Sequence, residues 1–302
     1  MVKDDAGAAF PVVVCYPTHE PETPRSLGPF ALSAAWEAEP ARGDYPPVML
    51  SHGSGSSPLV NRELALSLAR AGFCVGMPVH PGDNRDDRSL QDARQNLQQR
   101  PRHLQLAIDA LVQDDQRFLE AKPEGIALIG HSLGAYTALA LAGGEPRTLP
   151  DVWPDGPTAA IPVVHDPRVS ALVLLAPAAV WFHGLGSLDA VHVPVLMLGG
   201  EHDTITPPAQ HADLVAGRLP HPDLLDYRIV DGAGHYAFLS VFPPQMQQPG
   251  FLPAQDPPGF DRSVFQGVLA ETIITFLRNP AASVRGSRGC TPLGPASGPL
   301  GD

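Results

Sequence analysis

One five-residue stretch constrains the fold of this chain more than any other: Gly-His-Ser-Leu-Gly at positions 130–134. Four apolar residues at 126–129 precede it, as in a short buried strand, and a run of small residues typical of a closely packed helix follows it. A G-x-S-x-G sequence between a strand and a helix predicts a sharp turn whose serine has a strained backbone and projects from the end of the strand. The two glycines lack the Cβ atoms that would collide where the strand and the helix come together.

Ser132, at the centre of this turn, is therefore a candidate nucleophile. The following helix would place its positive N-terminal end beside the Ser132 hydroxyl, where an oxyanion would form. Because the pentapeptide alone also occurs by chance, its meaning depends on the rest of the chain. For a catalytic serine of this kind, an acid and then a histidine should follow downstream.

Asp203 is the candidate acid, because it lies in a loop just beyond the predicted strand 193–198. Open parallel sheets place their chemistry at the carboxyl ends of the strands. A carboxylate there would hold an imidazole in one tautomer and stabilise its cationic form. Glu201 is the local rival, and an aspartate at this position also serves commonly as a helix cap or a turn residue.

His235 is the candidate base, since it follows the last predicted strand, 227–230, in a glycine-bearing turn. The pKa of imidazole lies near neutrality, so it can take a proton from a serine and return it to a leaving group. The chain has 12 histidines, and His235 is distinguished by its position and by the order serine, acid, histidine. We expect His52 and His131 to orient loops beside the site, and His80 to be a candidate for the pocket wall.

A loop at 52–55, His-Gly-Ser-Gly, supplies the candidate oxyanion site. It follows the predicted strand 48–51, and its glycines would let backbone N–H groups point inward. We expect the oxyanion to be held by the backbone N–H groups of Ser54 and of Leu133, the residue after the nucleophile. The alternative, a phosphate-binding loop, is weaker because the lysine of a P-loop is absent.

The composition is that of a globular protein, with 43% hydrophobic and 17% charged residues in 302. The formal net charge is −12 and no run of Lys or Arg occurs, so neither a nucleic acid nor an anionic membrane is expected as a partner. The three cysteines are scattered, and no Cys/His spacing typical of a metal site is present. We therefore expect no disulfide framework, no metal and no cofactor.

The N-terminus lacks the long apolar region of a signal peptide, and no apolar run is long enough to span a bilayer. A cytoplasmic protein is the resulting expectation. A secreted or periplasmic protein whose leader had been trimmed would look the same. The sequence does not indicate an oligomeric state.

Predicted strands and helices alternate along the chain, and the central strands are apolar throughout. This pattern predicts an α/β fold with a mainly parallel central sheet and helices on both faces. The predicted strands are 10–17, 27–36 (an edge strand), 48–51, 73–78, 126–129, 169–176, 193–198 and 227–230. The predicted helices are 59–71, 102–118, about 133–142, 209–219 and 264–277.

We expect a single domain over residues 1–279. Two proline-rich stretches, at about 143–167 and 240–260, show little periodicity and are long for plain connections. Together with residues 180–183 they are expected to roof a pocket near the site. Residues 280–302 are rich in Gly, Pro, Ser and Arg, a composition typical of a disordered tail. The candidates for the substrate pocket are His80, His131, Trp181, Phe182 and Tyr236.

These motifs together resemble the α/β-hydrolase superfamily. More narrowly, the stretches at 50–55, 80–83 (His-Pro-Gly-Asp), 130–134 and 234–235 resemble bacterial predicted dienelactone hydrolases and related platelet-activating-factor-acetylhydrolase-like esterases. The similarity covers about residues 11–277. One departure matters: dienelactone hydrolase itself uses a cysteine nucleophile, whereas this chain has Ser132, so the name does not transfer its substrate.

Both the residues and the resemblance imply a serine hydrolase that cleaves small-molecule carboxylic esters of short to medium acyl length through an acyl-enzyme. Lactone or amide hydrolysis by the same three side chains is one alternative, because a fold does not fix a function. A non-catalytic binding protein on a hydrolase scaffold is another. The presence of the serine, the acid and the histidine together argues against it.

Overall fold

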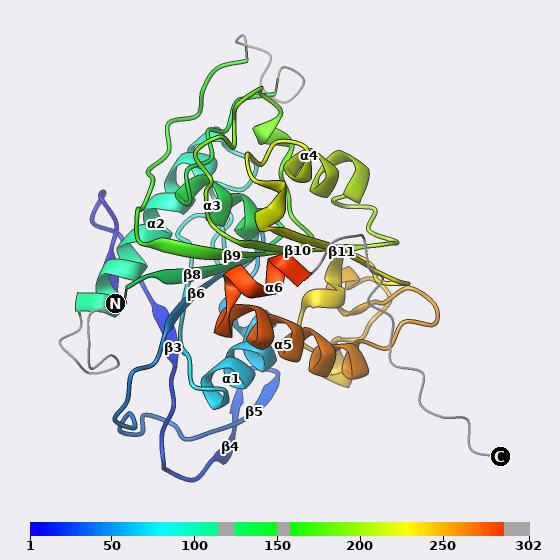
Figure 1. Ribbon diagram of the computed structural model, residues 1–302. Coiled ribbons are helices and arrows are strands. Elements are labelled where there is room, and N and C mark those ends of the chain that lie inside the picture. Colours follow the sequence, from blue (N-terminus) through cyan, green and yellow to red (C-terminus); the bar gives the residue numbers. More distant parts are fainter. Residues whose placement is uncertain (114–123, 150–157, 287–302) are drawn as a thin grey trace.

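A seven-stranded, mostly parallel sheet forms the centre of the computed structural model, which describes residues 1–113, 124–149 and 158–286 (Figure 1). Its strand order is β11-β10-β9-β8-β6-β7-β3, and of these strands β3 alone runs antiparallel to its neighbour. The strands are β3 (Val12–Cys15), β6 (Pro47–Ser51), β7 (Cys74–Pro78), β8 (Ile126–His131), β9 (Val169–Leu175), β10 (Val195–Gly200) and β11 (Leu225–Val230). The predicted α/β arrangement with a mainly parallel sheet is therefore observed.

Helices cover both faces of this sheet, with α2, α3 and α4 on one side and α1, α5 and α6 on the other (Figure 1). They are α1 (Arg62–Arg70), α2 (Arg94–Gln113), α3 (Leu133–Leu141), α4 (Ala212–Ala216), α5 (Arg262–Arg278) and α6 (Pro280–Gly286). Short 3₁₀ turns are η1 (Pro58–Asn61), η2 (Val180–Phe182), η3 (Pro208–Gln210), η4 (Pro222–Leu224), η5 (His235–Phe238), η6 (Pro244–Met246) and η7 (Leu252–Ala254). Among the described residues, no helix has the length and apolar character needed to cross a bilayer.

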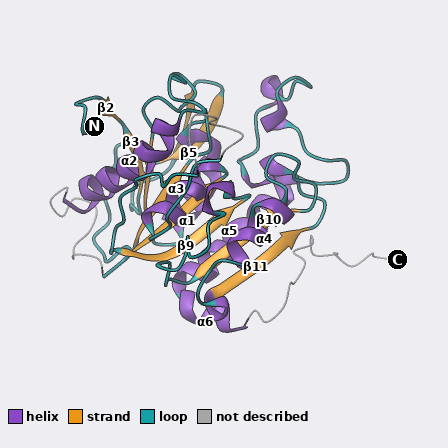
Figure 2. Cartoon of the chain, turned by 90° about the horizontal axis from the view of Figure 1, so that it is seen from above, coloured by secondary structure: helices purple, strands orange, loops and turns teal. Residues whose placement is uncertain are grey.

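Alternating side chains of the central strands build two separate hydrophobic layers. In β9, Leu172 and Leu174 pack beneath α2, α3 and α4, whereas Val173 and Leu175 pack against α1, α5 and α6. Successive residues of a strand point to opposite faces, so a strand buried on both sides must be apolar at every position. This explains why the central strands are continuous apolar runs. Viewed from above, β10 and β11 lie side by side across the sheet (Figure 2).

The segment predicted as an edge strand at 27–36 forms a hairpin instead. Strands β4 (Thr23–Leu27) and β5 (Phe30–Ala34) pair antiparallel as a separate two-stranded sheet. Gly28 in the turn between them has a φ of +59°, a conformation that glycine adopts without a steric cost. The predicted strand 10–17 is likewise divided, into β2 (Ala9–Phe10), which pairs with β1 (Val2–Lys3), and β3.

Helix α2 begins at Arg94 rather than at the predicted Arg102, so Pro101 lies inside it. Proline has no N–H group and cannot bond to the carbonyl four residues earlier, here that of Leu97. The Tyr136 hydroxyl on α3 donates to the Leu97 oxygen at 3.0 Å and takes the place of the lost bond. The predicted end of this helix, at 118, lies outside the described residues.

The predicted disordered tail is wrong for its first seven residues, which form α6. Asn279 caps this helix, because its Oδ1 accepts a hydrogen bond from the backbone N–H of Ala282 at 3.2 Å. Pro280 stands at the first helical position, where a missing N–H costs nothing. Val284 is only 3% exposed and belongs to the hydrophobic layer that also contains α5. Residues 287–302 lie outside the described part of the chain.

The other predicted elements agree in type with the structure and differ at their ends. The predicted helix 59–71 comprises η1 and α1, and the predicted helix 209–219 comprises η3 and the short α4. The strand and helix predicted around residues 126–142 are β8 and α3, and they meet at Ser132.

Candidate active site

Ser132 stands alone between β8 and α3, at φ +54° and ψ −119°. This left-handed backbone conformation costs a non-glycine residue roughly 1–3 kcal/mol, and such residues cluster at active sites. The Ser132 N–H donates to the Leu175 carbonyl at the end of β9, at 2.9 Å. The Ser132 carbonyl accepts from Ala178 N at 3.1 Å and from Ala135 N, in the first turn of α3, at 2.9 Å. Neighbouring elements thus hold the strained turn in place.

Both glycines of the turn are required by close contacts of the backbone. A Cβ atom added at Gly130 would lie 2.2 Å from the carbonyl oxygen of Gly134. One added at Gly134 would lie 1.9 Å from the carbonyl oxygen of Ser51, at the end of β6. Any side chain at either position would therefore push α3 away from the sheet.

Asp203 and His235 meet at the same edge of the sheet. Asp203 follows β10, His235 begins η5 after β11, and His235 Nδ1 lies 2.8 Å from Asp203 Oδ2. Both residues are buried, at 4% and 6% exposure. The other carboxylate oxygen of Asp203 accepts the backbone N–H groups of Ile205 and Thr206, each at 2.8 Å. The carboxylate is thus fixed by its own loop and directed at the imidazole.

The environment keeps Asp203 ionised. Burial alone would raise the pKa of Asp203, but the hydrogen bond and charge of His235, with the bonds from Thr206, outweigh burial and lower this pKa to about 2. The Thr206 hydroxyl lies 2.8 Å from Asp203 Oδ2, 3.0 Å from His235 Nδ1 and 3.1 Å from the carbonyl oxygen of Ala176. Sequence reasoning missed Thr206, although its place three residues after the candidate acid is a local signal.

His131 connects His235 to the nucleophile turn. Its Nε2–H donates to the carbonyl oxygen of His235 at 3.0 Å, and the two rings lie 4.9 Å apart between centroids. Ser132, the next residue, has a hydroxyl that makes no hydrogen bond to any residue in the described part of the chain. The structure contains no substrate, and hydrogen bonds of this kind are often long before substrate is bound. The three candidate side chains therefore lie on adjacent loops without a closed serine–histidine bond.

Glu201, the alternative candidate acid, forms a hydrogen bond to the backbone of a neighbouring loop. Its Oε2 accepts the backbone N–H of Gly232 at 2.7 Å, and about half of its side chain is exposed. Its carboxylate makes no hydrogen bond to His235, whereas Asp203 does. The geometry therefore favours Asp203 as the partner of the imidazole.

The loop at 52–55 passes directly beside the nucleophile. A Cβ atom added at Gly53 would lie 3.4 Å from the Ser132 Cβ and 3.3 Å from His131 Nδ1. Ser54 comes next in this loop, and Leu133 is the first residue of α3, whose N–H has no acceptor within the helix. Gly53, the residue before Ser54, thus lies beside Ser132, and Leu133 follows Ser132 directly in the chain.

Asp83, which sequence reasoning did not assign to the site, holds this loop. Its Oδ1 accepts the Ser54 hydroxyl at 2.9 Å and the backbone N–H of Gly55 at 2.6 Å. Arg100, on α2, forms an ion pair with Asp83 at 2.7 Å, and neither side chain is exposed. Asp83 could have been found from the motif at 80–83, but nothing in the periodicity of α2 marks Arg100.

Three of the predicted pocket residues are buried rather than open to a substrate. His80 and Phe182 are 0% exposed and His131 is 3% exposed. His80 Nε2 lies 2.9 Å from the Ser51 hydroxyl, beneath the loop at 52–55, and Phe182 packs in the hydrophobic layer with Tyr136. His80 and His131 therefore support loops of the candidate site from below, and Phe182 belongs to the hydrophobic layer, so the structure does not present these three side chains as an open pocket wall.

The neighbouring histidine, His52, is held neutral by its surroundings. Burial, with a smaller effect of the nearby Arg100 charge, lowers the pKa of His52 to about 3. His52 Nδ1–H donates to the carbonyl of Gly53 at 2.8 Å, and its Nε2 accepts the backbone N–H of His80 at 3.3 Å. His52 therefore orients the loop, as the sequence analysis expected.

Trp181 and Tyr236, the other two pocket candidates, are partly buried. The ring of Tyr236 stands edge-on to that of His235, with centroids 5.1 Å apart. Trp181 stands edge-on to Tyr136 at 5.2 Å. The backbone N–H of Arg147, in the first predicted insertion, donates to the Trp181 carbonyl at 2.7 Å. The structure thus joins residues 180–183 to that insertion, of which residues 150–157 lie outside the described part.

The second predicted insertion, 240–260, is anchored to the segment after the loop at 52–55. The backbone N–H of Ser240 donates to the Val60 carbonyl at 2.7 Å, and its hydroxyl accepts the N–H of Glu63 at 3.0 Å. Phe242 from the insertion and Phe30 from β5 form a small hydrophobic cluster beside Tyr236. This insertion therefore borders the candidate site on the side of His235.

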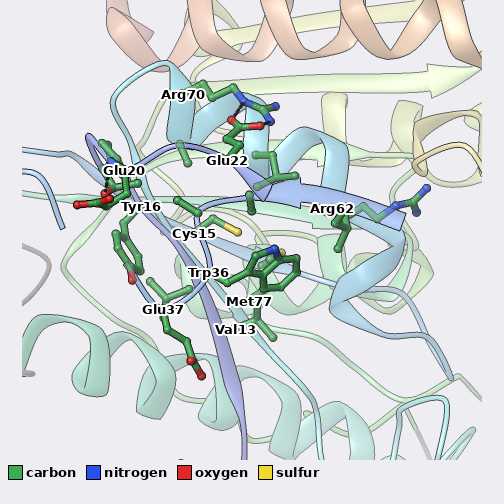
Figure 3. Close-up of a pocket in the computed structure, with 18 of the residues that line it drawn as sticks. Val13, Cys15, Tyr16, Glu20, Glu22, Trp36, Glu37, Arg62, Arg70 and Met77 are labelled. Carbon is green, nitrogen blue, oxygen red and sulfur yellow. Dashed lines mark hydrogen bonds and ion pairs between the residues drawn. The ribbon is translucent and has the colours of Figure 1, made fainter. Parts of the chain in front are cut away.

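A cavity of about 380 Å³ lies elsewhere, between β3, the hairpin β4–β5 and α1 (Figure 3). Trp36 and Met77 contribute to its mostly apolar lining, and Glu22 at its edge is paired with Arg70. None of the three candidate catalytic side chains lines it. In the described residues, no three His, Cys, Asp or Glu side chains gather as a metal site.

A comparison with a solved structure identifies the fold. A ferulic acid esterase from Streptomyces cinnamoneus aligns with a TM-score of 0.55 and 21% sequence identity, over 80% of this chain and 68% of the esterase. At that identity the likeness concerns the fold. With its mostly parallel sheet, flanking helices and strand–serine–helix turn, this chain has the α/β-hydrolase fold.

In sequence, the chain is similar to bacterial cutinases. It is 29% identical over 140 residues to Cutinase 2 of Thermobifida cellulosilytica, covering 46% of this chain and 44% of that protein. It is also 29% identical over 140 residues to Cutinase cut1 of Thermobifida fusca, covering 46% of this chain and 36% of that protein. The chain thus spans less than half the length of the curated relatives it matches. No protein-family model matches it.

Proposed function

We propose that this chain is a carboxylic ester hydrolase in which Ser132 is the nucleophile, His235 the general base and Asp203 the residue that orients His235. The observation that carries the proposal is the 2.8 Å contact between His235 and Asp203, on loops at the sheet edge where Ser132 has its left-handed backbone. The similarity to cutinases and to a ferulic acid esterase supports esters as the substrate class. The proposed catalytic unit is the domain predicted at residues 1–279 together with α6, which packs into the same hydrophobic layer as α5.

The reaction has two halves. His235 Nε2 takes the proton of Ser132 as the serine oxygen attacks the ester carbonyl carbon, and the backbone N–H groups of Ser54 and Leu133 stabilise the oxyanion. The intermediate collapses when the carbon–oxygen bond to the alcohol breaks and His235 returns the proton to that oxygen. Water then attacks the acyl carbon as His235 takes a proton from it, the bond between that carbon and the Ser132 oxygen breaks, and His235 returns the proton to Ser132 as the acid leaves.

The finer parts of the proposal rest on the resemblance and on composition. We infer acyl chains of short to medium length and a dienelactone-hydrolase-like subgroup, with Tyr236 and Trp181 beside the substrate. The insertions at 143–167 and 240–260 would roof the pocket, and limited proteolysis within them should then change the KM for esters. A small-molecule ester is the expected partner, and the cytoplasmic location expected from the sequence stays a prediction.

Turnover of p-nitrophenyl acetate by the wild-type chain and by Ser132→Ala tests the central assignment. We expect Ser132→Ala to fold normally and to lose essentially all turnover, and a fluorophosphonate probe to label the wild type but not the variant. Substantial turnover by Ser132→Ala would refute the assignment. A wild-type chain that is neither labelled nor active would instead indicate a binding protein on the same scaffold.

A panel of substrates separates the reaction classes that share this chemistry. Esters of increasing acyl length, lactones and anilides should be compared by kcat/KM on the same preparation. The proposal predicts the highest values for short- and medium-chain esters. A clear preference for lactones or anilides would replace ester hydrolysis with the alternative class while leaving the roles of the three side chains intact.

A further inference from the structure

A charged pair buried beneath the candidate oxyanion loop has no function in the scheme above. Asp83, in the loop after β7, and Arg100, on α2, are completely buried and 2.7 Å apart. The cost of removing two such charges from water often exceeds the gain from their attraction, so a buried ion pair is weak evidence for stability alone. The two side chains instead hold the loop that contains Ser54 and the start of α3.

Asp83 accepts four hydrogen bonds, two on each carboxylate oxygen. Oδ2 accepts Arg100 Nη1 and Asn96 Nδ2, both at 2.7 Å. Oδ1 accepts the Ser54 hydroxyl at 2.9 Å and the Gly55 N–H at 2.6 Å. Burial opposes the charge, but Arg100 and these hydrogen bonds keep the pKa of Asp83 below its usual value. The carboxylate thus fixes the position of Ser54 within its loop.

Arg100 uses its remaining donors on the two elements that flank Ser132. Its Nη2 donates to the carbonyl of His52, in the same loop as Ser54. Its Nε donates to the Thr137 hydroxyl on α3 at 3.0 Å, and that hydroxyl donates to the carbonyl of Leu133 at 2.9 Å. A single guanidinium is therefore connected to the loop that contains Ser54 and, through the Thr137 hydroxyl, to the backbone of Leu133.

We propose that the Asp83–Arg100 pair positions the oxyanion hole by fixing the N–H groups of Ser54 and Leu133 relative to each other. This inference rests on the proposed function. The two N–H groups come from segments far apart in the sequence, on different strand–loop connections. Donors aimed at an oxyanion must be held to within about 0.5 Å, and preorganised donors of this kind give large rate effects.

The chemistry of the pair suits this task. A guanidinium is planar and presents its five donors in a fixed geometry, so one arginine can orient several partners at once. An aspartate with all its acceptor sites occupied cannot rotate without breaking a bond in a buried place. Asp83 and Arg100 act through Ser54 and Leu133 and do not touch the substrate, so they are positioning residues.

The alternative is that the pair only stabilises the fold. Asp166 provides a matched control, because it is also buried and paired with an arginine, Arg168, at 2.5 Å. Although it falls at the end of the predicted insertion 143–167, Asp166 directly precedes β9 and so lies at the opposite edge of the sheet from Ser132, away from the proposed pocket. Asp166→Asn should lower the stability and leave kcat within about twofold of the wild type.

The test compares kcat, KM, thermal unfolding and fluorophosphonate labelling of the full chain, with p-nitrophenyl acetate as substrate and well below the unfolding temperature. We expect Asp83→Asn to lower kcat by roughly 10- to 100-fold, with KM changed by less than about threefold. Labelling of Ser132 should slow in proportion. Inhibition by a trifluoromethyl ketone, whose adduct carries an oxyanion, should weaken by a similar factor.

If Asp83→Asn does not fold, two milder variants test the same positioning role. Ser54→Ala removes an exposed hydroxyl that bonds to Asp83 but keeps the Ser54 N–H, and we expect a fall in kcat of about 3- to 10-fold without a loss of stability. Thr137→Val breaks the connection from Arg100 to Leu133 and should lower kcat similarly, whereas Thr137→Ser should restore it.

The outcomes separate this inference from the proposed function. If Ser132→Ala is inactive and unlabelled while Ser54→Ala, Thr137→Val and any folded Asp83→Asn keep the wild-type kcat, the positioning role is wrong and the ester hydrolase stands. If Ser132→Ala keeps its turnover, the proposed function fails first. A reduced kcat shared equally by Asp166→Asn would show a general effect of stability and would also overturn the inference.

Discussion

The two sides of Ser132 are built in different ways. On the side of β10 and β11, Asp203 is held by the N–H groups of residues two and three positions further along its own loop. On the side of β6 and β7, Ser54 is held by Asp83, which is 29 residues away and is itself held by Arg100. The first arrangement is local and polar, and the second is a buried network drawn from distant segments.

This difference suggests a division of tasks. In the proposed mechanism, the side with Asp203 (the acid side) keeps one imidazole in one tautomer, which a single loop can do. The side with Ser54 (the oxyanion side) would have to align two backbone N–H groups from separate connections, which requires side chains that reach across several elements. We therefore expect changes on the acid side to reduce activity more than stability, and changes in the buried Asp83–Arg100 pair on the oxyanion side to reduce both. The following predictions test this contrast.

The largest effect on activity is expected on the acid side. Asp203→Asn keeps the size of the side chain but allows His235 to take the wrong tautomer, so kcat should fall on the order of 10⁴-fold. The variant should still unfold cooperatively, because the surrounding loop bonds remain available. Ester turnover and calorimetry on the same sample measure both. A kcat within tenfold of the wild type would remove Asp203 from the proposed site.

The largest effect on stability is expected on the oxyanion side. Arg100→Met leaves the Asp83 carboxylate buried without its partner, which should cost about 3–5 kcal/mol of unfolding free energy. Denaturant titration measures this cost. The double variant Asp83→Leu with Arg100→Met removes both charges and should lose less than the sum of the two single changes. Strictly additive losses would show that the pair is not the source of the effect.

Low pH should reduce the unfolding free energy of the chain, because histidines are buried on the oxyanion side. Burial, with a contribution from the Arg100 charge, lowers the pKa of His103 to about 4, below the unfolded value near 6.5. Between these values the unfolded chain binds a proton that the folded chain does not. The resulting stability is therefore complete above about pH 6.5 and is lost as the pH falls towards 4. The burial of His52, whose pKa is lowered to about 3, acts in the same direction.

His103→Phe tests this origin of the pH dependence. The ring of His103 packs 5.5 Å from Phe10 and 5.9 Å from His80, and its Nδ1 has no hydrogen-bond partner among the described residues. Phenylalanine should reduce the slope of unfolding free energy against pH between 4 and 6.5 by up to about 1.4 kcal/mol per pH unit. An unchanged slope in His103→Phe would contradict the assignment.

The same contrast explains how far the sequence alone could lead. Asp203 and His235 could be placed because each follows an apolar strand in a short loop, and the order of the three side chains has a local signal. Thr206 could have been found in the same way. Asp83 lies in a motif to which the sequence assigned no function. Nothing in the sequence marks Arg100, because the burial of a helical arginine depends on packing that no single segment encodes.

The errors in the predicted fold also have long-range causes. Helix α2 continues through Pro101 because the Tyr136 hydroxyl, on another helix, replaces a missing backbone bond. Helix α6 forms in a stretch whose composition favours disorder because Asn279 caps it and Val284 reaches the core. In each case a contact with another part of the fold determines where the helix begins or whether it forms. The strands of the sheet, in contrast, were predictable from their own apolar pattern.

The smaller effect on the acid side is expected at Thr206, where Asp203 is supported by one hydroxyl. Thr206→Val keeps the shape but removes the contact to Asp203 Oδ2, 2.8 Å away. Asp203 is ionised, and a hydrogen bond to a charged group contributes about 1.5–3 kcal/mol, so kcat should fall by roughly 12- to 160-fold. KM should not change, because Thr206 is only 5% exposed and cannot contact a substrate. Thr206→Ser retains the hydroxyl and should restore kcat. If Thr206→Val is as active as Thr206→Ser and the wild type, the backbone N–H groups alone hold Asp203, and the proposed contribution of the Thr206 hydroxyl is wrong.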